Sequence, residues 1–354
     1  MIHIMASSKK VKLLYSKKQI NEAWKALAKL PEWKIDENNL KILNNRRAVH
    51  DYPMNTFQSL LRSKIKSLRY NSIIVERLKR TYSIVGKLKR NPDMMLARMQ
   101  DIWWLRVVVR EVDYVYKLRD ILLKSKFAHK LIREDDYIRK PKSSWYRSLH
   151  MVYKYQNSYA PEYNWLQIEI QLRTELEHIR ATAVETMWII LQVSLKSWEW
   201  SKDWLEFFSL ISSIFAIKEW CIPLPQHQWK DIKDLKNSLI KLENKLHAYQ
   251  KMDAYNKAIN FIDTNLSKKK KLYEHYLLIL NIKERTIQVK WFKKGELEDA
   301  TANYLDEEKN FKDENVWQVV LVAWESLKAL THAYPNYFWD TRMFLNHLKN
   351  ALSN

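Results

Sequence analysis

Glycine occurs at only two positions of this 354-residue chain, Gly86 and Gly295, whereas tryptophan occurs at 16. Average glycine usage of about 7% would give roughly 25 glycines in a chain of this length. Glycine accepts positive φ without strain, so tight turns and helix ends normally depend on it. The shortage therefore restricts the turns that the chain can form, and it raises the question of why a tryptophan, Trp145, stands in the turn-like stretch SSWYRSLH.

The charge of the chain predicts polyanionic partners. The formal net charge is +21, which favours nucleotides or nucleic acid, although a merely solvated basic surface has the same composition. The single cysteine, Cys221, excludes a disulfide framework and a cysteine-rich metal site, and it favours a reducing, cytoplasmic compartment. No apolar run reaches the roughly 18 to 20 residues of a membrane span, so no membrane partner is expected.

Periodicity predicts an α+β protein. Apolar residues at helical spacing predict helices over 14–30, 49–68, 72–91, 113–125, 175–195, 203–219, 230–266 and 296–309. Alternating or β-branched runs predict strands over 105–112, 146–156, 166–174 and 317–324, and a hairpin over 275–292. We expect 146–156 and 166–174 to pair in antiparallel fashion.

A Pro-containing stretch, CIPLPQHQ, separates the apolar helices before it from a long charged helix after it. It predicts a domain boundary near residue 226. The resulting domains are an N-terminal helical segment over 1–60, a central domain over 61–226, and a small C-terminal α+β domain over 230–354 whose role the sequence does not reveal.

Three groups of polar residues could carry chemistry. The first is basic and lies on the predicted helix 72–91, where spacings of three, four and seven bring part of the set onto one face: Arg77, Lys79, Arg80, Ser83, Lys87, Lys89 and Arg90. Such a face suits a triphosphate, although an exposed basic helix has the same pattern.

The second group is acidic. Asp101 stands just before a strand, and Glu169 lies in the middle of LQIEIQLRT. Alternation places Glu169, Gln171 and Arg173 on one face of that strand. Two carboxylates of this kind could hold Mg²⁺ with phosphates completing the shell, or the strand could simply face solvent.

The third group is the stretch DYIRKPKSSWYRSLH. It offers Lys140 and Lys142 to phosphates, Tyr146 as a platform for a base, and His150 at the start of a strand. Tyr146 is a better nucleotide candidate than an isolated loop tyrosine because Lys142, Arg147 and Ser144 flank it.

Four stretches together resemble the RelA/SpoT family of alarmone synthetases: RLKRTYSIVGKL, DIWWLRVVV, DYIRKPKSSWYRSLH and IEIQLRTELEHIRATAVE. Their order over about 100 residues carries the resemblance, which covers roughly residues 40–220. The family's hydrolase domain is not recognisable, so the resemblance implies a synthetase-only form. It implies a nucleotidyltransferase-like synthetase fold, a mixed sheet flanked by helices. The implied activity is transfer of the β,γ-pyrophosphate of ATP to the 3′-hydroxyl of GTP or GDP, with Mg²⁺ as cofactor.

The resemblance also implies roles for individual residues. Arg77, Lys79 and Lys87 would clamp the ATP phosphates, and Ser83 would order their helix. The remaining roles are divided between the metal, the transferred group and the acceptor. Asp101 would bind Mg²⁺ and Arg106 would neutralise the transferred group; Lys142, Tyr146 and His150 would bind the acceptor; Glu169 would bind Mg²⁺ and take the proton of the 3′-hydroxyl, supported by Gln171 and Arg173.

The family pattern has glycine where this chain has Trp104 and Trp145, and Trp165 follows Asn164 where Asn-Gly would make a hairpin turn. Other tryptophans also stand where small residues are easier to accept: Trp24, Trp103, Trp188, Trp198, Trp200 and Trp220. Trp204 is predicted to be a true core residue. We infer that most of these tryptophans are glycine codons (UGA) read with the wrong code. Arg180 and Arg46 stand where the family has tryptophan, which indicates a second codon reassignment. Genuine divergence to an inactive homologue is the alternative.

Two further functions are compatible with the same residues. A toxin related to this family would transfer pyrophosphate to the 3′ end of tRNA. A non-catalytic homologue would bind a nucleotide or RNA without catalysing the transfer. Retention of both Asp101 and Glu169 favours an enzyme. Homo-oligomer formation is left open by the sequence.

Overall fold

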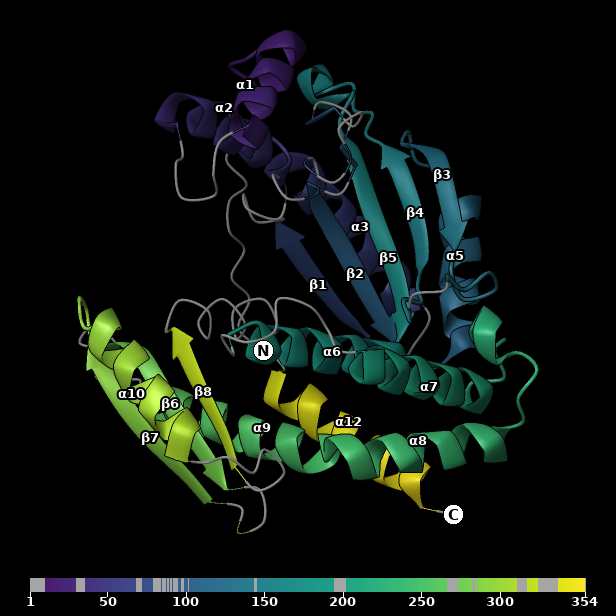
Figure 1. Cartoon of the computed structure of the whole chain (residues 1–354). Helices are drawn as coiled ribbons and strands as arrows, with labels where there is room; N and C mark the ends of the chain where they lie inside the picture. The colour runs from purple at the N-terminus through teal and green to yellow at the C-terminus, as the bar shows by residue number, and fades with distance from the viewer. Residues whose placement is uncertain are drawn as a thin grey trace. The chain divides into compact units, whose positions relative to one another are not determined.

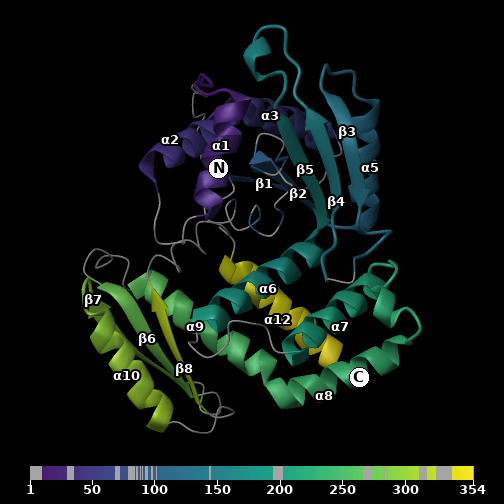
Figure 2. The same ribbon diagram turned by 45° about the horizontal axis from the view of Figure 1, so that its top comes forward.

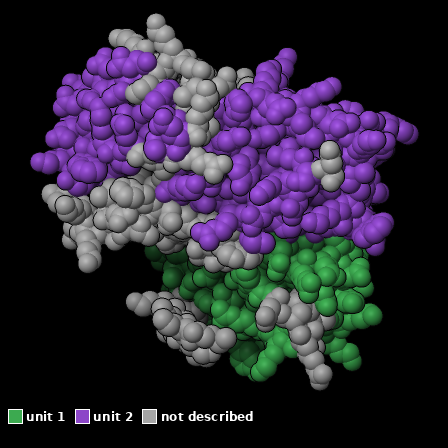
Figure 3. All heavy atoms as spheres, turned by 90° about the horizontal axis from the view of Figure 1, so that it is seen from below, with its two compact units in different colours: residues 1–137, 148–175 green, residues 138–147, 176–354 purple. Residues whose placement is uncertain are grey.

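The computed structural model describes residues 10–29, 36–67, 72–78, 84, 87, 89, 91, 95–96, 99–100, 102–142, 145–193, 202–265, 273–281, 284, 286–310, 317–323 and 337–353. The chain divides into two compact units (Figure 3). Unit 1 contains residues 1–137 and 148–175, and unit 2 contains residues 138–147 and 176–354. These bounds differ from those of the predicted domains 1–60, 61–226 and 230–354, which stay predictions.

Unit 1 is built on a five-stranded sheet with the order β1-β2-β5-β4-β3 (Figure 1). Its strands are β1 (Ile73–Leu78), β2 (Trp103–Val109), β3 (Lys130–Asp136), β4 (Leu149–Lys154) and β5 (Gln167–Thr174). Strands β2 and β5 are parallel, and the other neighbours are antiparallel. The sheet is therefore mixed, which confirms the predicted fold class, and β4 and β5 pair as predicted.

Helices α3 (Asp51–Ser67) and α5 (Val112–Lys124) cover one face of this sheet (Figure 2). Alternate residues of the central strands supply the buried apolar side of that face, among them Leu105, Ile170 and Leu172, each fully buried. Their alternation is the reason that the opposite face carries the polar residues of the same strands. Helices α1 (Lys17–Lys29) and α2 (Glu37–Ala48) precede α3 in the chain.

The predicted helix over 72–91 is wrong at its start, because residues 73–78 form strand β1. The segment begins with Ile-Ile-Val, whose branched side chains favour an extended backbone, and it pairs along its whole length with β2. Lys87 and Lys89 have helical conformation, so the later part agrees with the prediction where it is described. Strand β3 was not predicted, since its sequence KLIREDD is mostly charged and lies at the sheet edge.

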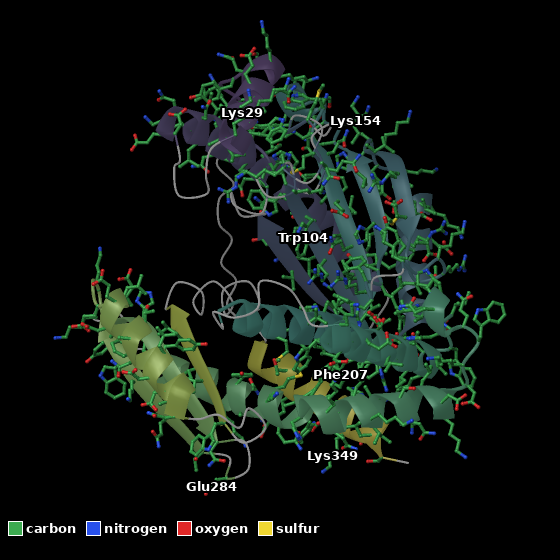
Figure 4. All side chains as sticks on the ribbon, in the orientation of Figure 1. Lys29, Trp104, Lys154, Phe207, Glu284 and Lys349 are labelled. Atoms are coloured by element: carbon green, nitrogen blue, oxygen red, sulfur yellow. The ribbon has the colours of Figure 1, made fainter. Side chains whose placement is uncertain are left out.

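Unit 2 contains helices α6 (Glu175–Val193), α7 (Lys202–Lys218), α8 (Ile232–Leu246), α9 (Ala248–Asn265) and α12 (Tyr337–Leu352). Their apolar faces form one core cluster that includes Trp204, Phe207, Leu239 and Phe344. Trp204 is 6% exposed, so the prediction that it is a core residue is confirmed. Phe207, on α7, is labelled in Figure 4.

A second sheet in unit 2 has the order β7-β6-β8, with β6 (Tyr273–Asn281), β7 (Thr286–Lys293) and β8 (Trp317–Ala323). It confirms the predicted hairpin and the predicted strand that follows. Helix α10 (Leu297–Asn310) packs on one face through Ala300 and Tyr304, which contact Leu277 and Ile279 of β6. The alternate residues Tyr276 and Leu278 join the helical core, so the sheet has two buried faces.

The predicted helix over 230–266 is two helices, α8 and α9, separated at His247. This residue has φ 50° and ends α8 in the left-handed conformation. Both oxygens of the Glu243 carboxylate accept the Tyr249 amide, at 3.0 and 3.2 Å, at the start of α9. No glycine or proline marks this break, so periodicity alone does not predict it.

Helix α7 ends in a Schellman motif whose left-handed residue is Trp220. The Cys221 amide donates to the Ala216 carbonyl at 2.8 Å, and the Trp220 amide donates to the Ile217 carbonyl at 3.0 Å. Trp220 has φ 58°. Glycine is the usual residue at this position of the motif, and Gly295, at φ 90°, has the same type of backbone in the turn after β7.

Among the described helices, none combines the length and the apolar character needed to cross a membrane.

Candidate active site

The polar face of the five-stranded sheet brings four predicted site residues together. In the parallel pairing of β2 with β5, Trp104 lies opposite Glu169 and Arg106 opposite Gln171. In the antiparallel pairing of β4 with β5, His150 lies opposite Gln171. Because residues paired across strands share a face, Arg106, Glu169, Gln171 and His150 line one side of three adjacent strands.

Two direct contacts organise this face. The Nδ1 atom of the His150 imidazole contacts Oε1 of the Glu169 carboxylate. The Arg106 guanidinium donates through Nε and Nη2 to Oε1 of Gln171, at 3.3 and 3.2 Å. A carboxylate and a cation are thus each held in place by a partner from a neighbouring strand, which is the kind of preorganisation that transfer of a charged group requires.

Aromatic residues complete the face, and sequence reasoning gave neither of them this role. The Arg106 guanidinium lies over the Trp104 ring at 4.4 Å, and Trp104 is labelled on the sheet in Figure 4. The Tyr137 ring meets the His150 ring edge to face, with centroids 5.3 Å apart. Tyr137 is the second residue of the motif DYIRKPKSSWYRSLH. The motif therefore included this residue, although the sequence pattern alone assigned no function to the Tyr137 side chain.

The charged side chains of this face are buried. Arg106 is 5% exposed, Glu169 6% and Arg173 3%. Burying charges is costly unless they are paired and hydrogen-bonded, and the His150–Glu169 and Arg106–Gln171 contacts supply such partners. The predicted polar row of β5 is therefore real, but the interpretation of a solvent-facing strand is wrong.

The predicted ATP-binding residues are only partly described. Arg77 lies on strand β1, opposite Trp104 in the register, rather than on a helix. Lys87 is half-buried in a helical segment. Lys79 and Ser83 lie outside the described residues, and so does Asp101, the predicted second metal ligand.

The predicted acceptor residues Lys142 and Tyr146 lie on the loop 138–147, which belongs to unit 2. Lys142 is exposed and Tyr146 is half-buried. Arg147, which flanks Tyr146 in the sequence, is 2% exposed. Its guanidinium donates to the Ile138 carbonyl at 3.3 Å and to the Ile222 carbonyl.

A magnesium site fits the donor chemistry of this face. Mg²⁺ prefers oxygen ligands and usually takes one or two carboxylates together with substrate phosphates. Glu169 supplies a buried carboxylate of this kind. The described residues contain no cluster of three or more metal-binding side chains, so a metal ion here would need phosphate oxygens to complete its shell.

Residues 76–190 match the family model described as "Region found in RelA / SpoT proteins". This span contains the end of β1, from Glu76 onward, and all of β2, β3, β4 and β5. It therefore includes the four residues of the polar face, Arg106, His150, Glu169 and Gln171. The match confirms the resemblance that the four sequence motifs indicated.

The chain is similar to several characterised and solved proteins. It is 32% identical over 114 residues to the GTP pyrophosphokinase YjbM of Bacillus subtilis, covering 31% of this chain and 52% of that protein. It is 25% identical over 154 residues, 43% of this chain, to a probable guanosine-3′,5′-bis(diphosphate) 3′-pyrophosphohydrolase of Mycoplasma pneumoniae, of which it spans 20%. Among solved structures, small alarmone synthetase 2 of Bacillus subtilis is 19% identical with a TM-score of 0.43, over 50% of this chain and 94% of that one.

The chain thus spans about half the length of one curated relative and about a fifth of the other.

Proposed function

We propose that this chain transfers the β,γ-pyrophosphate of ATP to the 3′-hydroxyl of GTP or GDP. The observation that carries the proposal is the buried contact of Glu169 with His150, beside the Arg106–Gln171 pair, within the residues that match the RelA/SpoT region. The relative named a GTP pyrophosphokinase shares 32% of its residues with this chain over the matched part, which favours the same acceptor class.

In the proposed reaction, the 3′-oxygen of the acceptor attacks the β-phosphorus of ATP. The bond between the β-phosphorus and the oxygen that bridges it to the α-phosphate breaks, and AMP leaves. The 3′-hydroxyl proton passes to the Glu169 carboxylate, which the His150 imidazole holds in position. Such a reaction spreads negative charge over phosphate oxygens, so fixed cations and alignment matter more than a covalent nucleophile.

Arg106 is the fixed cation of this site. Gln171 holds its guanidinium, so that little reorganisation is needed when charge develops on the transferred group. Glu169, together with Asp101, would hold Mg²⁺, which when bound neutralises phosphate charge and aligns the transferred group.

The remaining assignments concern substrate binding. We assign the ATP phosphates to Arg77, Lys79 and Lys87, with Ser83 ordering their segment. Lys142 would contact the acceptor phosphate, and Tyr146 would stack on its base; Arg173 would support Glu169 from the same strand.

A labelling experiment tests the proposal. The protein is incubated with Mg²⁺ and ATP labelled at the β-phosphate, with GDP, GTP and bulk tRNA offered in separate reactions. Label in a guanosine nucleotide, lost in Glu169→Gln and kept in the matched control Glu162→Gln, is the expected result. Label in tRNA would show that the acceptor is the 3′ end of tRNA rather than a guanosine nucleotide. Label in none of the acceptors would favour the non-catalytic homologue.

A further inference from the structure

The loop 138–147 links β3 to β4 and carries the proposed acceptor residues Lys142 and Tyr146. The Tyr137 amide donates to the Ser148 carbonyl at 3.1 Å, immediately outside the two ends of the loop. The loop itself is grouped with helices α6 and α7 in unit 2. Its conformation therefore depends on contacts beyond the hairpin that it connects.

Arg147 ties both ends of this loop together and to the segment that follows α7. Its Nη1 donates to the carbonyl of Ile138, the first residue of the loop, at 3.3 Å. Its Nη2 donates to the carbonyl of Ile222. Burial lowers the pKa of Arg147, and the Glu177 carboxylate of α6 opposes this shift by favouring the charged form.

Two adjacent serines of α7 hold the same parts of the chain. Ser212 Oγ donates to the Trp145 carbonyl at 3.1 Å, one residue before Tyr146. Ser213 Oγ accepts the Leu224 amide at 3.1 Å, and lies 2.9 Å from Nδ1 of His227. Ser212 and Ser213 are fully buried. The loop and the segment 221–228 are thus both fastened to one helix, and Arg147 connects them.

Arg147 has no access to a phosphate of its own, because its side chain is 2% exposed and its guanidinium faces backbone carbonyls. A buried guanidinium is an expensive way to stabilise a fold when an apolar residue could fill the same space. Arg147 is the last residue of the loop that carries Lys142 and Tyr146, and its guanidinium contacts the first residue of the loop, Ile138, and the segment after α7 at Ile222. Contacts of this kind fix the two ends of the loop, as a positioning role requires.

We propose that Arg147, together with Ser212, is a positioning residue that presents Lys142 and Tyr146 to the acceptor nucleotide. This inference rests on the proposed function, since it concerns the acceptor of that reaction. It adds that acceptor binding depends on the packing of α6 and α7 in unit 2, through side chains that do not touch the nucleotide.

Steady-state kinetics separate positioning from a general loss of fold. In Arg147→Met, we expect the KM for GDP to rise about tenfold, whereas the KM for ATP and kcat change less than twofold; loss of an interaction that serves binding alone appears in KM. Arg147→Lys retains a positively charged donor group but not the forked guanidinium that reaches two carbonyls, and its KM for GDP should be intermediate. Ser212→Ala should raise the same KM, and it provides the test if Arg147→Met does not fold. The exposed Arg110→Met is the matched control.

Hydrogen exchange provides a readout that does not depend on activity. Peptides that span 138–147 should exchange faster in Arg147→Met and Ser212→Ala, with those of β4 and β5 unchanged. Unchanged loop exchange, or an unchanged KM for GDP in variants that fold, would overturn the inference. If the unsubstituted protein transfers no label, the proposed function fails and the acceptor role of the loop fails with it, while loop exchange still decides whether Arg147 anchors the loop.

Discussion

At the scale of single residues, the account depends most on Glu169. Glu169 is 6% exposed, and its carboxylate contacts the His150 imidazole. A carboxylate in this setting has a fixed direction and can receive a proton from a hydroxyl placed next to it. Arg106 and Gln171, paired on the same face, supply a cation whose position does not depend on the substrate.

Replacing Glu169 by Gln keeps the shape of the side chain and a hydrogen-bond acceptor for His150, but removes the base. We expect transfer to fall by about 10²–10⁴-fold, the usual contribution of a general base, with a cooperative unfolding transition retained. The measurement is the initial rate of label transfer from ATP, combined with urea unfolding. Full activity in Glu169→Gln would remove Glu169 from the role of base, and the exposed Glu162→Gln should behave like the original protein.

Among the tryptophans that the structure describes, Trp220 is the one whose backbone has a positive φ, the conformation that favours glycine. Non-glycine residues in the left-handed conformation are strained by roughly 1–2 kcal/mol, and Trp220 gains no compensating burial because it is 98% exposed. We therefore expect Trp220→Gly to raise the free energy of unfolding by about 1 kcal/mol. Trp229→Gly is the control, since Trp229 is also exposed, at 92%, but does not have positive φ. An equal gain in both variants would contradict a backbone origin.

The strain argument does not extend to the other described tryptophans. Trp104, Trp145 and Trp165 lie in a strand, a bend and a turn, and none of the three has a positive φ. Of the two arginines interpreted as misread tryptophans, Arg46 is buried, which lowers its pKa to about 9, and its guanidinium lies 4.4 Å from the Trp165 ring. Arg180 is paired with Glu177 at 2.7 Å, so this structure accommodates it as an arginine.

The code hypothesis remains a prediction, and mass spectrometry of peptides from the natural protein decides it. Glycine at position 220 in those peptides is the expected result. Tryptophan there would refute the hypothesis at the position where the backbone supports it best.

At the scale of elements, features that depend on the sequence of one segment could be predicted, whereas contacts between two distant segments could not. Strand β5 was predicted because its residues alternate, and the Glu169–Gln171 row followed from it. The Arg106–Gln171 contact could not be foreseen, since it requires β2 to lie parallel to β5 across a long connection. Strand β1 was missed because its basic residues suggested an amphipathic helix.

The junction of α2 and α3 contains a histidine that must stay neutral. His50 is fully buried, its Nδ1 lies 2.9 Å from the Arg46 carbonyl, and its Nε2 has no hydrogen-bond partner among the described residues. Burial, followed by the charge of Arg46, places the pKa of His50 well below its usual 6.5. Below about pH 6.5 the unfolded chain therefore binds a proton that the folded chain does not.

This difference predicts acid sensitivity. The free energy of unfolding should be constant above about pH 6.5 as far as His50 is concerned, and should fall by up to about 1.4 kcal/mol per pH unit below it. In His50→Leu, the free energy of unfolding should fall less steeply between about pH 6.5 and 5, by up to about 1.4 kcal/mol per pH unit. Urea unfolding at several pH values measures it, and identical pH profiles for the two proteins would contradict the assignment.

At the scale of the whole molecule, the residues predicted for the site fall into two different compact units. Glu169, His150 and Arg106 belong to unit 1, whereas Lys142 and Tyr146 belong to unit 2. The sequence predicted these residues as one set from their motifs, but it could not assign them to units, because membership of a unit depends on contacts between distant segments. The charge of +21 is a property of the whole chain and does not by itself select the acceptor.

Salt dependence separates a small acceptor from a nucleic acid. A protein that makes 6–10 phosphate contacts with nucleic acid loses roughly 10³–10⁵ in affinity between 50 and 200 mM salt. A nucleotide has far fewer phosphates, so we expect the KM for GDP to change by less than about tenfold over this range. A steep loss of GDP turnover would contradict this expectation and would point to the protein's general charge as the main source of affinity.

The most direct test of the account is the identity of the second product. Transfer of pyrophosphate from ATP must release one AMP for each acceptor that is modified, whereas transfer of a single phosphate would release ADP. Anion-exchange chromatography and mass spectrometry of a reaction with ATP, GDP and Mg²⁺ measure both products. We predict equal amounts of AMP and of GDP heavier by one pyrophosphate; ADP as the product, or AMP formed without modified acceptor, would contradict the account.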